Sequence, residues 1–132
     1  MPSEELLQHY CRAFGAKDAP AVAALFADGA LYELPLLGQR LVGPAEIRVG
    51  LERAFALLER CAIALGDMKS SARVAIAEGR LSAKLRRDAQ PMGAPLAIVI
   101  ECREECISRL ATHLDARPYR LWSDGPIFAV AG

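Results

Sequence analysis

Three side chains near the end of the chain combine residue types that can move a proton or hold a polar ligand: Arg109, His113 and Asp115. Imidazole and carboxylate groups serve as general acids and bases, and a guanidinium lowers the pKa of a neighbouring carboxyl group. The three positions have the same parity, so on a β-strand they share one face, with His113 and Asp115 about 7 Å apart. We therefore take Asp115 and His113 as candidate catalytic residues and Arg109 as a candidate ligand-binding residue.

The same charged row has a simpler interpretation. A strand of a half-exposed sheet carries polar residues on the face that meets solvent, and its opposite face contributes to the core. If the charged row instead points inward, the semi-apolar residues of opposite parity would suit a homodimer interface on the outer face. Those residues are Ser108, Leu110, Thr112 and Leu114.

The elements that must position these residues follow from hydrophobic periodicity. Spacings of three and four predict helices over residues 3–14, 18–26 and 44–58, with Ser3 and Asp18 as N-caps. Alternation predicts strands over residues 30–34, 38–42, 74–76, 81–86, 96–102 and 107–116, with Gly79 and Arg80 in a turn. Helices followed by a meander indicate an α+β domain, with the helices packed on one face of a curved antiparallel sheet.

Composition excludes several classes of protein. The 132 residues are 53% hydrophobic, and 16 basic residues balance 16 acidic ones. A disordered chain has low hydrophobicity and high net charge, and a neutral chain has no overall field that would attract nucleic acid or an anionic membrane. The longest aliphatic stretch, Leu96 to Ile100, is far shorter than the roughly 20 residues that span a bilayer. The chain begins with acidic residues rather than a basic signal sequence, and we expect a cytoplasmic protein.

Four cysteines are too few for a disulfide framework and lack zinc-site spacing, so we expect packed, reduced thiols and no metal. The sequence contains no glycine-rich phosphate loop, and no cofactor is implied. Cys102 or Cys106 acting as a nucleophile with His113 would lack a third group to orient the imidazole.

Residues 8–55 carry a family resemblance. The segment "QHYCRAFGAKDAPAVAALFADGALYELPLLG", followed by "GPAEIRVGLERAF", resembles the NTF2-like superfamily, particularly its SnoaL-like and ketosteroid-isomerase-like members. The segment "ISRLATHLDARP" also fits the pattern of the family's last strand. The resemblance spans about residues 4 to 116, and we expect one domain over residues 1–132 with 117–132 as a C-terminal extension.

The resemblance implies a cone-shaped α+β fold. Three N-terminal helices would pack on a strongly curved, antiparallel or mixed sheet around an apolar cavity, and many such proteins are dimers. Tyr10 matches the tyrosine that binds the dienolate oxygen in ketosteroid isomerases. Leu34 stands where those enzymes have their aspartate base, and Ile100 stands where they have a second acid. We therefore reject steroid isomerisation by that mechanism.

SnoaL-like cyclases offer a closer model. In these enzymes an aspartate at the position of Asp115 acts as general acid and base beside the substrate carbonyl. An apolar cavity would raise the pKa of this carboxyl group and Arg109 would lower it. We expect Tyr10, Tyr32, Phe14 and Phe55 to line the cavity as ligand-binding residues.

Two functions remain open on this basis. One is a small enzyme that binds an apolar cyclic or polyketide-like molecule, moves a proton beside a carbonyl group and acts as a homodimer, without binding nucleic acid or membranes. The other is a non-catalytic module for ligand binding or dimerisation, which would use the same cavity and the outer face of the sheet.

Overall fold

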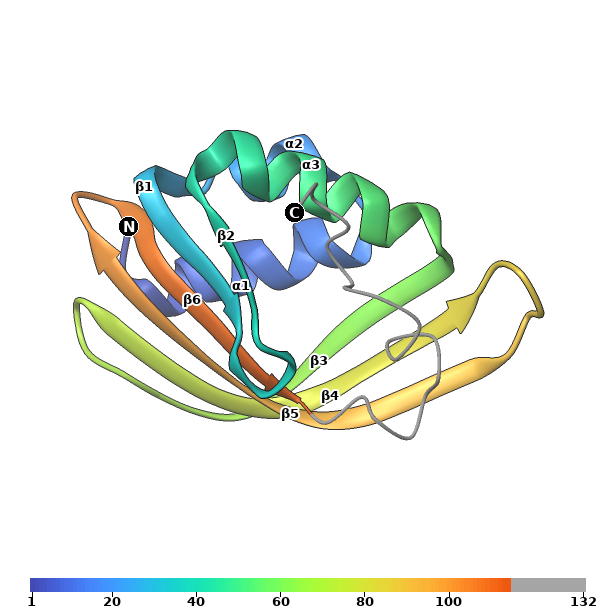
Figure 1. Cartoon of the computed structure of the whole chain (residues 1–132). Helices are drawn as coiled ribbons and strands as arrows, with labels where there is room; N and C mark the ends of the chain where they lie inside the picture. The colour runs from blue at the N-terminus through green and yellow to red at the C-terminus, as the bar shows by residue number, and fades with distance from the viewer. Residues whose placement is uncertain (115–132) are drawn as a thin grey trace.

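The computed structural model of the chain describes residues 1–114, which form three α-helices and six β-strands (Figure 1). In chain order the elements are α1 Ser3–Gly15, α2 Ala19–Ala23, β1 Phe26–Leu34, β2 Gln39–Val42, α3 Gly43–Ala56, β3 Leu58–Ser70, β4 Val74–Leu85, β5 Pro91–Arg103 and β6 Cys106–Leu114. A short 3-10 turn, Pro35–Leu37, joins β1 to β2. Figure 1 shows the sheet bending beneath the three helices, which lie together on its concave side. The expected α+β class, with three helices packed on a curved sheet, is confirmed.

The sheet has the strand order β2-β1-β6-β5-β4-β3. Strand β1 pairs with β6 in parallel, and every other neighbouring pair is antiparallel, so the sheet is mixed. The parallel pair is important for the site, because it brings residues 31–33 against residues 109–111. Side chains from β1, near the start of the chain, therefore lie next to side chains from β6 on both faces of the sheet.

Two predicted helix starts have different outcomes. Asp18 caps α2, since its carboxylate accepts a hydrogen bond of 3.0 Å from the backbone N–H of Ala21. The prediction for Ser3 is wrong: Pro2 occupies the N-cap position of α1. The Ser3 hydroxyl is buried and donates instead to the carbonyls of Ser71 and Val74, at 2.6 and 3.1 Å. This residue ties α1 to the β3–β4 connection rather than starting the helix.

The predicted turn at Gly79 and Arg80 is also wrong, because both residues lie inside β4. A Cβ atom on Gly79 would come within 2.4 Å of the Ala64 carbonyl oxygen, so glycine allows β3 and β4 to approach closely. The register between these strands shifts just beyond this point, between Leu65 and Met68. The long strand β3, Leu58–Ser70, was not predicted, and Leu58 opens it rather than ending the helical stripe.

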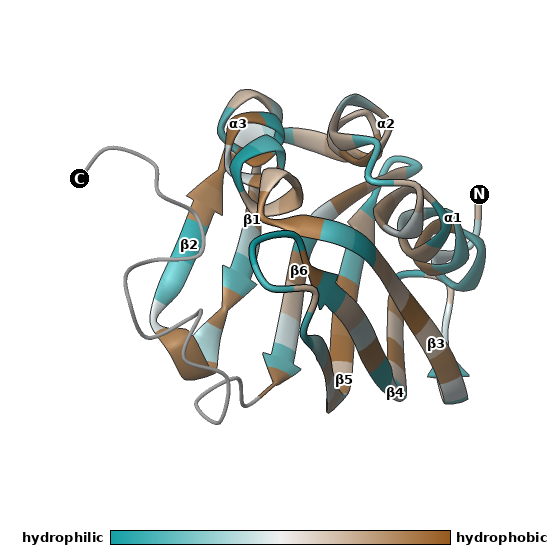
Figure 2. Ribbon diagram, turned by 90° about the vertical axis from the view of Figure 1, so that its right-hand side faces the viewer, coloured by the Kyte–Doolittle hydropathy of each residue, from teal (hydrophilic) through white to brown (hydrophobic). Residues whose placement is uncertain are grey.

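The core lies between the helices and the inner face of the sheet. Figure 2 shows apolar and polar residues alternating along the strands, with the three helices on one side. The alternation is complete in β5, where the even-numbered positions from Met92 to Cys102 are buried and their neighbours are half-buried or exposed. Within residues 1–114, no helix has both the length and the apolar character needed to cross a bilayer.

Candidate functional site

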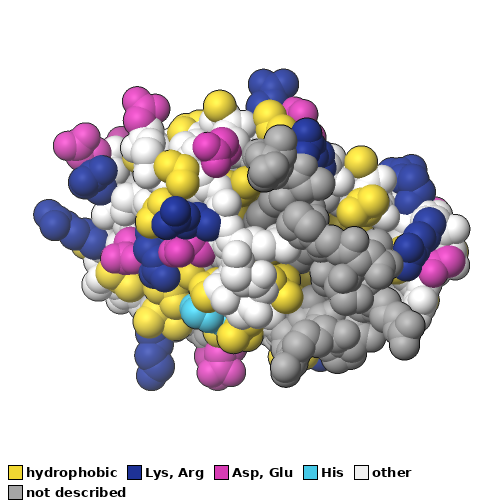
Figure 3. Space-filling view, in the orientation of Figure 1, with side chains coloured by type: hydrophobic (Ala, Val, Ile, Leu, Met, Phe, Trp, Pro, Cys, Tyr) yellow, Lys and Arg dark blue, Asp and Glu magenta, His cyan; other side chains and the backbone are white. Residues whose placement is uncertain are grey.

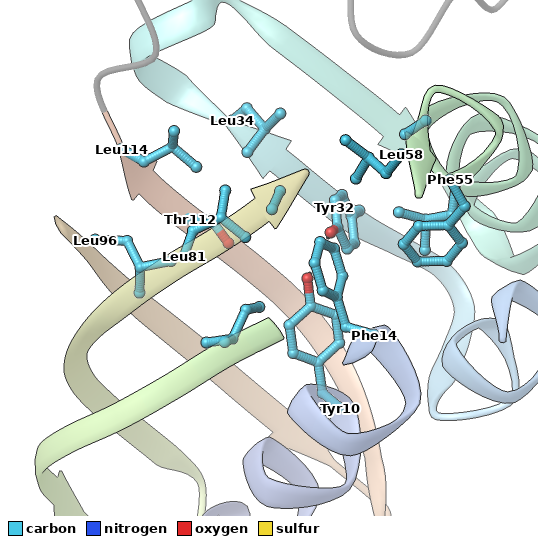
Figure 4. Close-up of a pocket in the computed structure, with 14 residues that line it drawn as sticks. Tyr10, Phe14, Tyr32, Leu34, Phe55, Leu58, Leu81, Leu96, Thr112 and Leu114 are labelled. Carbon is cyan, nitrogen blue, oxygen red and sulfur yellow. Dashed lines mark hydrogen bonds between the residues drawn. The ribbon is translucent and has the colours of Figure 1, made fainter. Parts of the chain in front are cut away.

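An apolar cavity of about 50 Å³ lies between the helices and the inner face of the sheet, and it is partly open to the surface (Figure 4). The side chains that line it come from α1, α3 and all of the strands except β2. They are Tyr10, Phe14, Tyr32, Leu34, Leu51, Ala54, Phe55, Leu58, Ile63, Leu81, Ala83, Leu96, Thr112 and Leu114. Within residues 1–114, none of these lining side chains is a carboxylate, an imidazole, an amine or a guanidinium.

Two tyrosines supply most of the polarity of the cavity. Tyr10 lies on the apolar stripe of α1, and Tyr32 lies on the inner face of β1 between the buried Ala30 and Leu34. Their hydroxyl oxygens are 2.5 Å apart and share a hydrogen bond, in which either group can donate. Figure 4 shows the two side chains meeting inside the cavity. The bond joins the first helix to the first strand inside the core.

Both tyrosines stay neutral at physiological pH. Burial raises the pKa of Tyr10 well above 10.0, and the neighbouring Tyr32 raises it further. Burial also raises the pKa of Tyr32, although the hydrogen bond with Tyr10 partly lowers it. A phenol in an apolar site keeps its proton because the phenolate would lose its hydration. The pair therefore acts as neutral hydrogen-bonding groups and not as a base.

A third hydroxyl group faces the same space. Thr112 on β6 is only 5% exposed, and its Oγ1 atom has no hydrogen-bond partner among the described residues. Figure 4 shows the Thr112 oxygen directed toward the space beside the two tyrosines. The register explains its position: Tyr32 lies opposite Leu110 on the neighbouring strand, and Thr112 follows two residues later on the same face.

Aromatic rings form the helix side of the cavity. The rings of Phe14 and Phe55 meet edge to face with their centroids 5.2 Å apart, and Tyr10 packs against Phe14 at 5.9 Å. Such contacts fix ring orientation and restrict how far the wall can move. The structure thus places four of the expected ligand-binding residues, Tyr10, Phe14, Tyr32 and Phe55, against the cavity.

The expected orientation of the charged row on β6 is wrong for Arg109. Its guanidinium lies on the outer face, where Nε donates to Glu33 Oε1 at 2.6 Å and Nη1 donates to Glu101 Oε2 at 3.0 Å. These two bonds raise the pKa of Arg109. Figure 3 shows basic and acidic side chains meeting on the outer face over β1 and β6. A guanidinium held by two carboxylates on that face is unable to bind a ligand in the cavity.

His113 lies on the outer side as well. It falls between Thr112 and Leu114, which both line the cavity, and it is paired with Ala97 of β5. Consecutive side chains of a strand point to opposite faces, so the imidazole projects away from the cavity. The inward orientation expected for His113 is therefore also wrong. Asp115, the other expected catalytic residue, lies outside the described residues.

Because Arg109 and His113 face outward, the expected dimer surface is different too. Leu110, Thr112 and Leu114 are buried on the inner face, so they form no outer interface. Only the fourth member of that set, Ser108, is accessible, and its hydroxyl donates to the Glu101 carbonyl at 3.0 Å. Thr112 was missed as a cavity residue, although its position between two leucines of the same parity is a sign that this face is the buried one.

Three of the described thiols, those of Cys11, Cys61 and Cys102, are buried. Burial raises the pKa of Cys102, which leaves little reactive thiolate at neutral pH. Over residues 1–114, no three His, Cys, Asp or Glu side chains are grouped so that they could hold a metal ion. The chemistry available in the described cavity is therefore that of three hydroxyl groups on an apolar wall.

Comparison with known proteins agrees with this architecture. The family model of the SnoaL-like domain matches residues 7–110. No curated protein sequence matches the chain significantly.

Solved structures share the fold at low sequence identity. A ketosteroid-isomerase-like protein of Catenulispora acidiphila, solved in complex with trimethylamine, has a TM-score of 0.82 and 17% identity over 96% of this chain and 97% of its own. A proposed SnoaL-like polyketide cyclase of Shewanella putrefaciens has a TM-score of 0.79 and 15% identity, covering 94% and 96%. A cystatin-fold protein of Novosphingobium aromaticivorans has a TM-score of 0.75 and 18% identity, covering 85% and 97%. At these identities the likeness concerns the fold alone.

Proposed function

The chain belongs to the SnoaL-like domain family of the NTF2-like superfamily, and we propose that it binds a small, neutral, largely apolar molecule whose carbonyl or hydroxyl oxygen contacts Tyr10 and Tyr32. The observation that supports this most directly is the pair of buried, protonated phenols in an otherwise apolar cavity. A ligand that fills this cavity gains about 25 cal/mol for each Å² of apolar surface removed from water. Hydrogen bonds to the phenols would fix its orientation.

The size of the cavity limits the ligand. About 50 Å³ accommodates only a few non-hydrogen atoms, fewer than the benzene that fits an engineered cavity of about 150 Å³. We therefore propose that the oxygen-bearing end of the ligand enters first and that the remainder extends toward the open side. A polycyclic, polyketide-like molecule would need lining side chains to move.

In a catalytic form of this proposal, the chain transfers a proton at the carbon atom beside the carbonyl group of the ligand. When a base removes the proton on the α-carbon, negative charge develops on the carbonyl oxygen, and fixed hydroxyl donors in a water-poor site stabilise that charge. None of the described lining residues is such a base. We propose Asp115 as the base of this form on the resemblance to SnoaL-like cyclases alone, and the outward orientation of Arg109 and His113, which share its parity, argues against it.

Binding without turnover is the alternative, and it is favoured because none of the described lining residues carries a carboxylate or an imidazole. Cyclic ketones from cyclobutanone to cycloheptanone can test both forms. Chemical-shift perturbations of the ¹⁵N-labelled chain report binding, and exchange of the ketone α-protons for deuterium in D₂O reports enolisation.

The two forms differ in the effect of Asp115→Asn. If the chain is an enzyme, the wild type accelerates deuterium exchange above the buffer rate, and D115N lowers that acceleration about 10²-fold or more while ketone binding persists. If the wild type binds ketones without accelerating exchange, the binding module is supported. If no member of the ketone series shifts the resonances of cavity residues, the proposed function is wrong.

A further inference from the structure

Thr112 carries a hydroxyl group that the folded chain does not use. Oγ1 is buried and has no hydrogen-bond partner among the described residues. The side chains on the same face of β6, Leu110 and Leu114, are apolar, and its partner on β5 is Ile98. A buried hydroxyl group without a hydrogen bond costs free energy. Valine has nearly the same shape and would fill this position without that cost.

The unpaired hydroxyl belongs to a residue that lines the cavity. Thr112 is one of the lining residues, and its oxygen is directed toward the space beside Tyr10 and Tyr32 (Figure 4). A ligand oxygen in that space would be near hydroxyl groups from α1, β1 and β6. The three elements come from opposite ends of the described chain, and the parallel pairing of β1 with β6 brings two of them together.

We propose that Thr112 is a ligand-binding residue that selects molecules with a hydrogen-bonding oxygen over hydrocarbons of the same shape. This inference rests on the proposed function, because it assigns to the same cavity a second anchor beside the tyrosine pair. The Thr112 hydroxyl donates to a ketone oxygen, and in a water-poor site the loss of such a bond lowers affinity measurably.

The same cavity disfavours ions. No described lining residue carries a charge at neutral pH, since both phenols remain protonated. A carboxylate or ammonium group buried there would have no counter-charge among these residues, and burying an unpaired charge is far costlier than burying a carbonyl group. The ligand class is therefore a neutral ketone, aldehyde or alcohol with an apolar body.

Two substitutions at one position test the selectivity. Thr112→Val removes the hydroxyl and keeps the shape, whereas Thr112→Ser keeps the hydroxyl and removes the methyl group. Each is titrated with cyclopentanone and with methylenecyclopentane, in which CH₂ replaces the carbonyl oxygen. We expect T112V to weaken cyclopentanone binding about 5- to 10-fold relative to methylenecyclopentane, in line with the loss of one hydrogen bond. T112S should keep the ketone preference of the wild type.

Thermal unfolding without ligand gives an independent measurement. Because T112V removes an unpaired buried hydroxyl, we expect its unfolding midpoint to rise by about 3 °C, and that of T112S to fall. A hydroxyl that serves the fold would show the reverse for T112V. Lower ketone preference together with a higher midpoint in T112V would support the proposal.

The possible failures are distinguishable. If T112V keeps the ketone preference while Tyr32→Phe lowers it, the inference about Thr112 is wrong and the proposed function stands. If a water molecule alone satisfies the hydroxyl, T112V leaves the preference unchanged and does not raise the midpoint, which also overturns the inference. If the wild-type chain binds the ketone no better than its methylene analogue, both the inference and the role of the tyrosines fail.

Discussion

The hydroxyl oxygens of Tyr10 and Tyr32 lie 2.5 Å apart in the interior, although 22 residues separate them in the chain. One residue belongs to the first helix and the other to the first strand, so their bond both holds α1 on the sheet and places two hydroxyl groups in the cavity, with one of the two protons used in the bond between them. The same two tyrosines therefore have a structural role and a proposed ligand-binding role. To distinguish the two roles, stability and ligand binding must be measured on the same variants.

Substitution of either tyrosine by phenylalanine should destabilise the chain. Each single change leaves the other hydroxyl without this partner, and we expect the free energy of unfolding to fall by about 1–2 kcal/mol. The double variant Y10F/Y32F should lose less than the sum of the two single variants, because neither hydroxyl remains. Urea unfolding of the four proteins measures this coupling. Strict additivity would mean that the bond contributes nothing.

Stability should fall in alkaline solution. Burial raises the pKa of the Cys11 thiol from 9.0 to about 12, and burial raises that of Cys61 to about 11 although Lys17 lowers it. The unfolded chain loses these protons first, so the folded state is favoured fully below pH 9. That contribution decreases as the pH rises toward 11 to 12, by up to about 1.4 kcal/mol per pH unit for each thiol.

Urea unfolding between pH 8 and 10.5 measures this slope. The variant C11A/C61A should be less stable at pH 8, because it loses packed side chains, yet its stability should depend less on pH. The slope is the diagnostic quantity, since a packing defect alone would shift the whole curve. The same slope in the variant and the wild type would contradict the assignment to these thiols.

Arg109 should contribute to stability and not to ligand binding. Its guanidinium joins Glu33 of β1 and Glu101 of β5 on the outer face, and Arg109→Met leaves those carboxylates without their shared cation. Because the pairs are partly exposed, we expect a loss of about 1 kcal/mol, reduced in 1 M NaCl. Arg80→Met is the matched control, since Arg80 is exposed on the outer face of β4 and forms no ion pair within the described residues. Loss of ketone binding in R109M would contradict the observed orientation of β6.

We propose that the outer face of the sheet pairs two copies of the chain. Ile76 is 49% exposed there, opposite the half-buried Val99, and an exposed apolar pair of this kind favours association. Light scattering at micromolar concentration should return twice 14.2 kDa for the wild type and 14.2 kDa for Ile76→Lys. Val49→Lys, on α3 and equally accessible, should remain dimeric. A monomeric wild type would overturn this proposal.

Much of the architecture follows from local patterns in the chain. Helical spacing places Tyr10 and Phe14 on one buried stripe, and alternation places Tyr32 between Ala30 and Leu34. These patterns depend on neighbouring residues and on the burial of apolar surface, so they can be read from a short window. The same reasoning failed at Gly79, because this glycine is needed where the backbone of Ala64, on another strand, comes close to it.

Parity established which residues of β6 share a face, but only the tertiary structure decided which face is inside. Glu33 comes from a strand 76 residues earlier and, with Glu101, gives Arg109 its counter-charges outside the core. That arrangement leaves Thr112 facing the cavity. The choice depends on the whole balance of burial and charge across three strands, and a single strand's pattern carries no information about its partners.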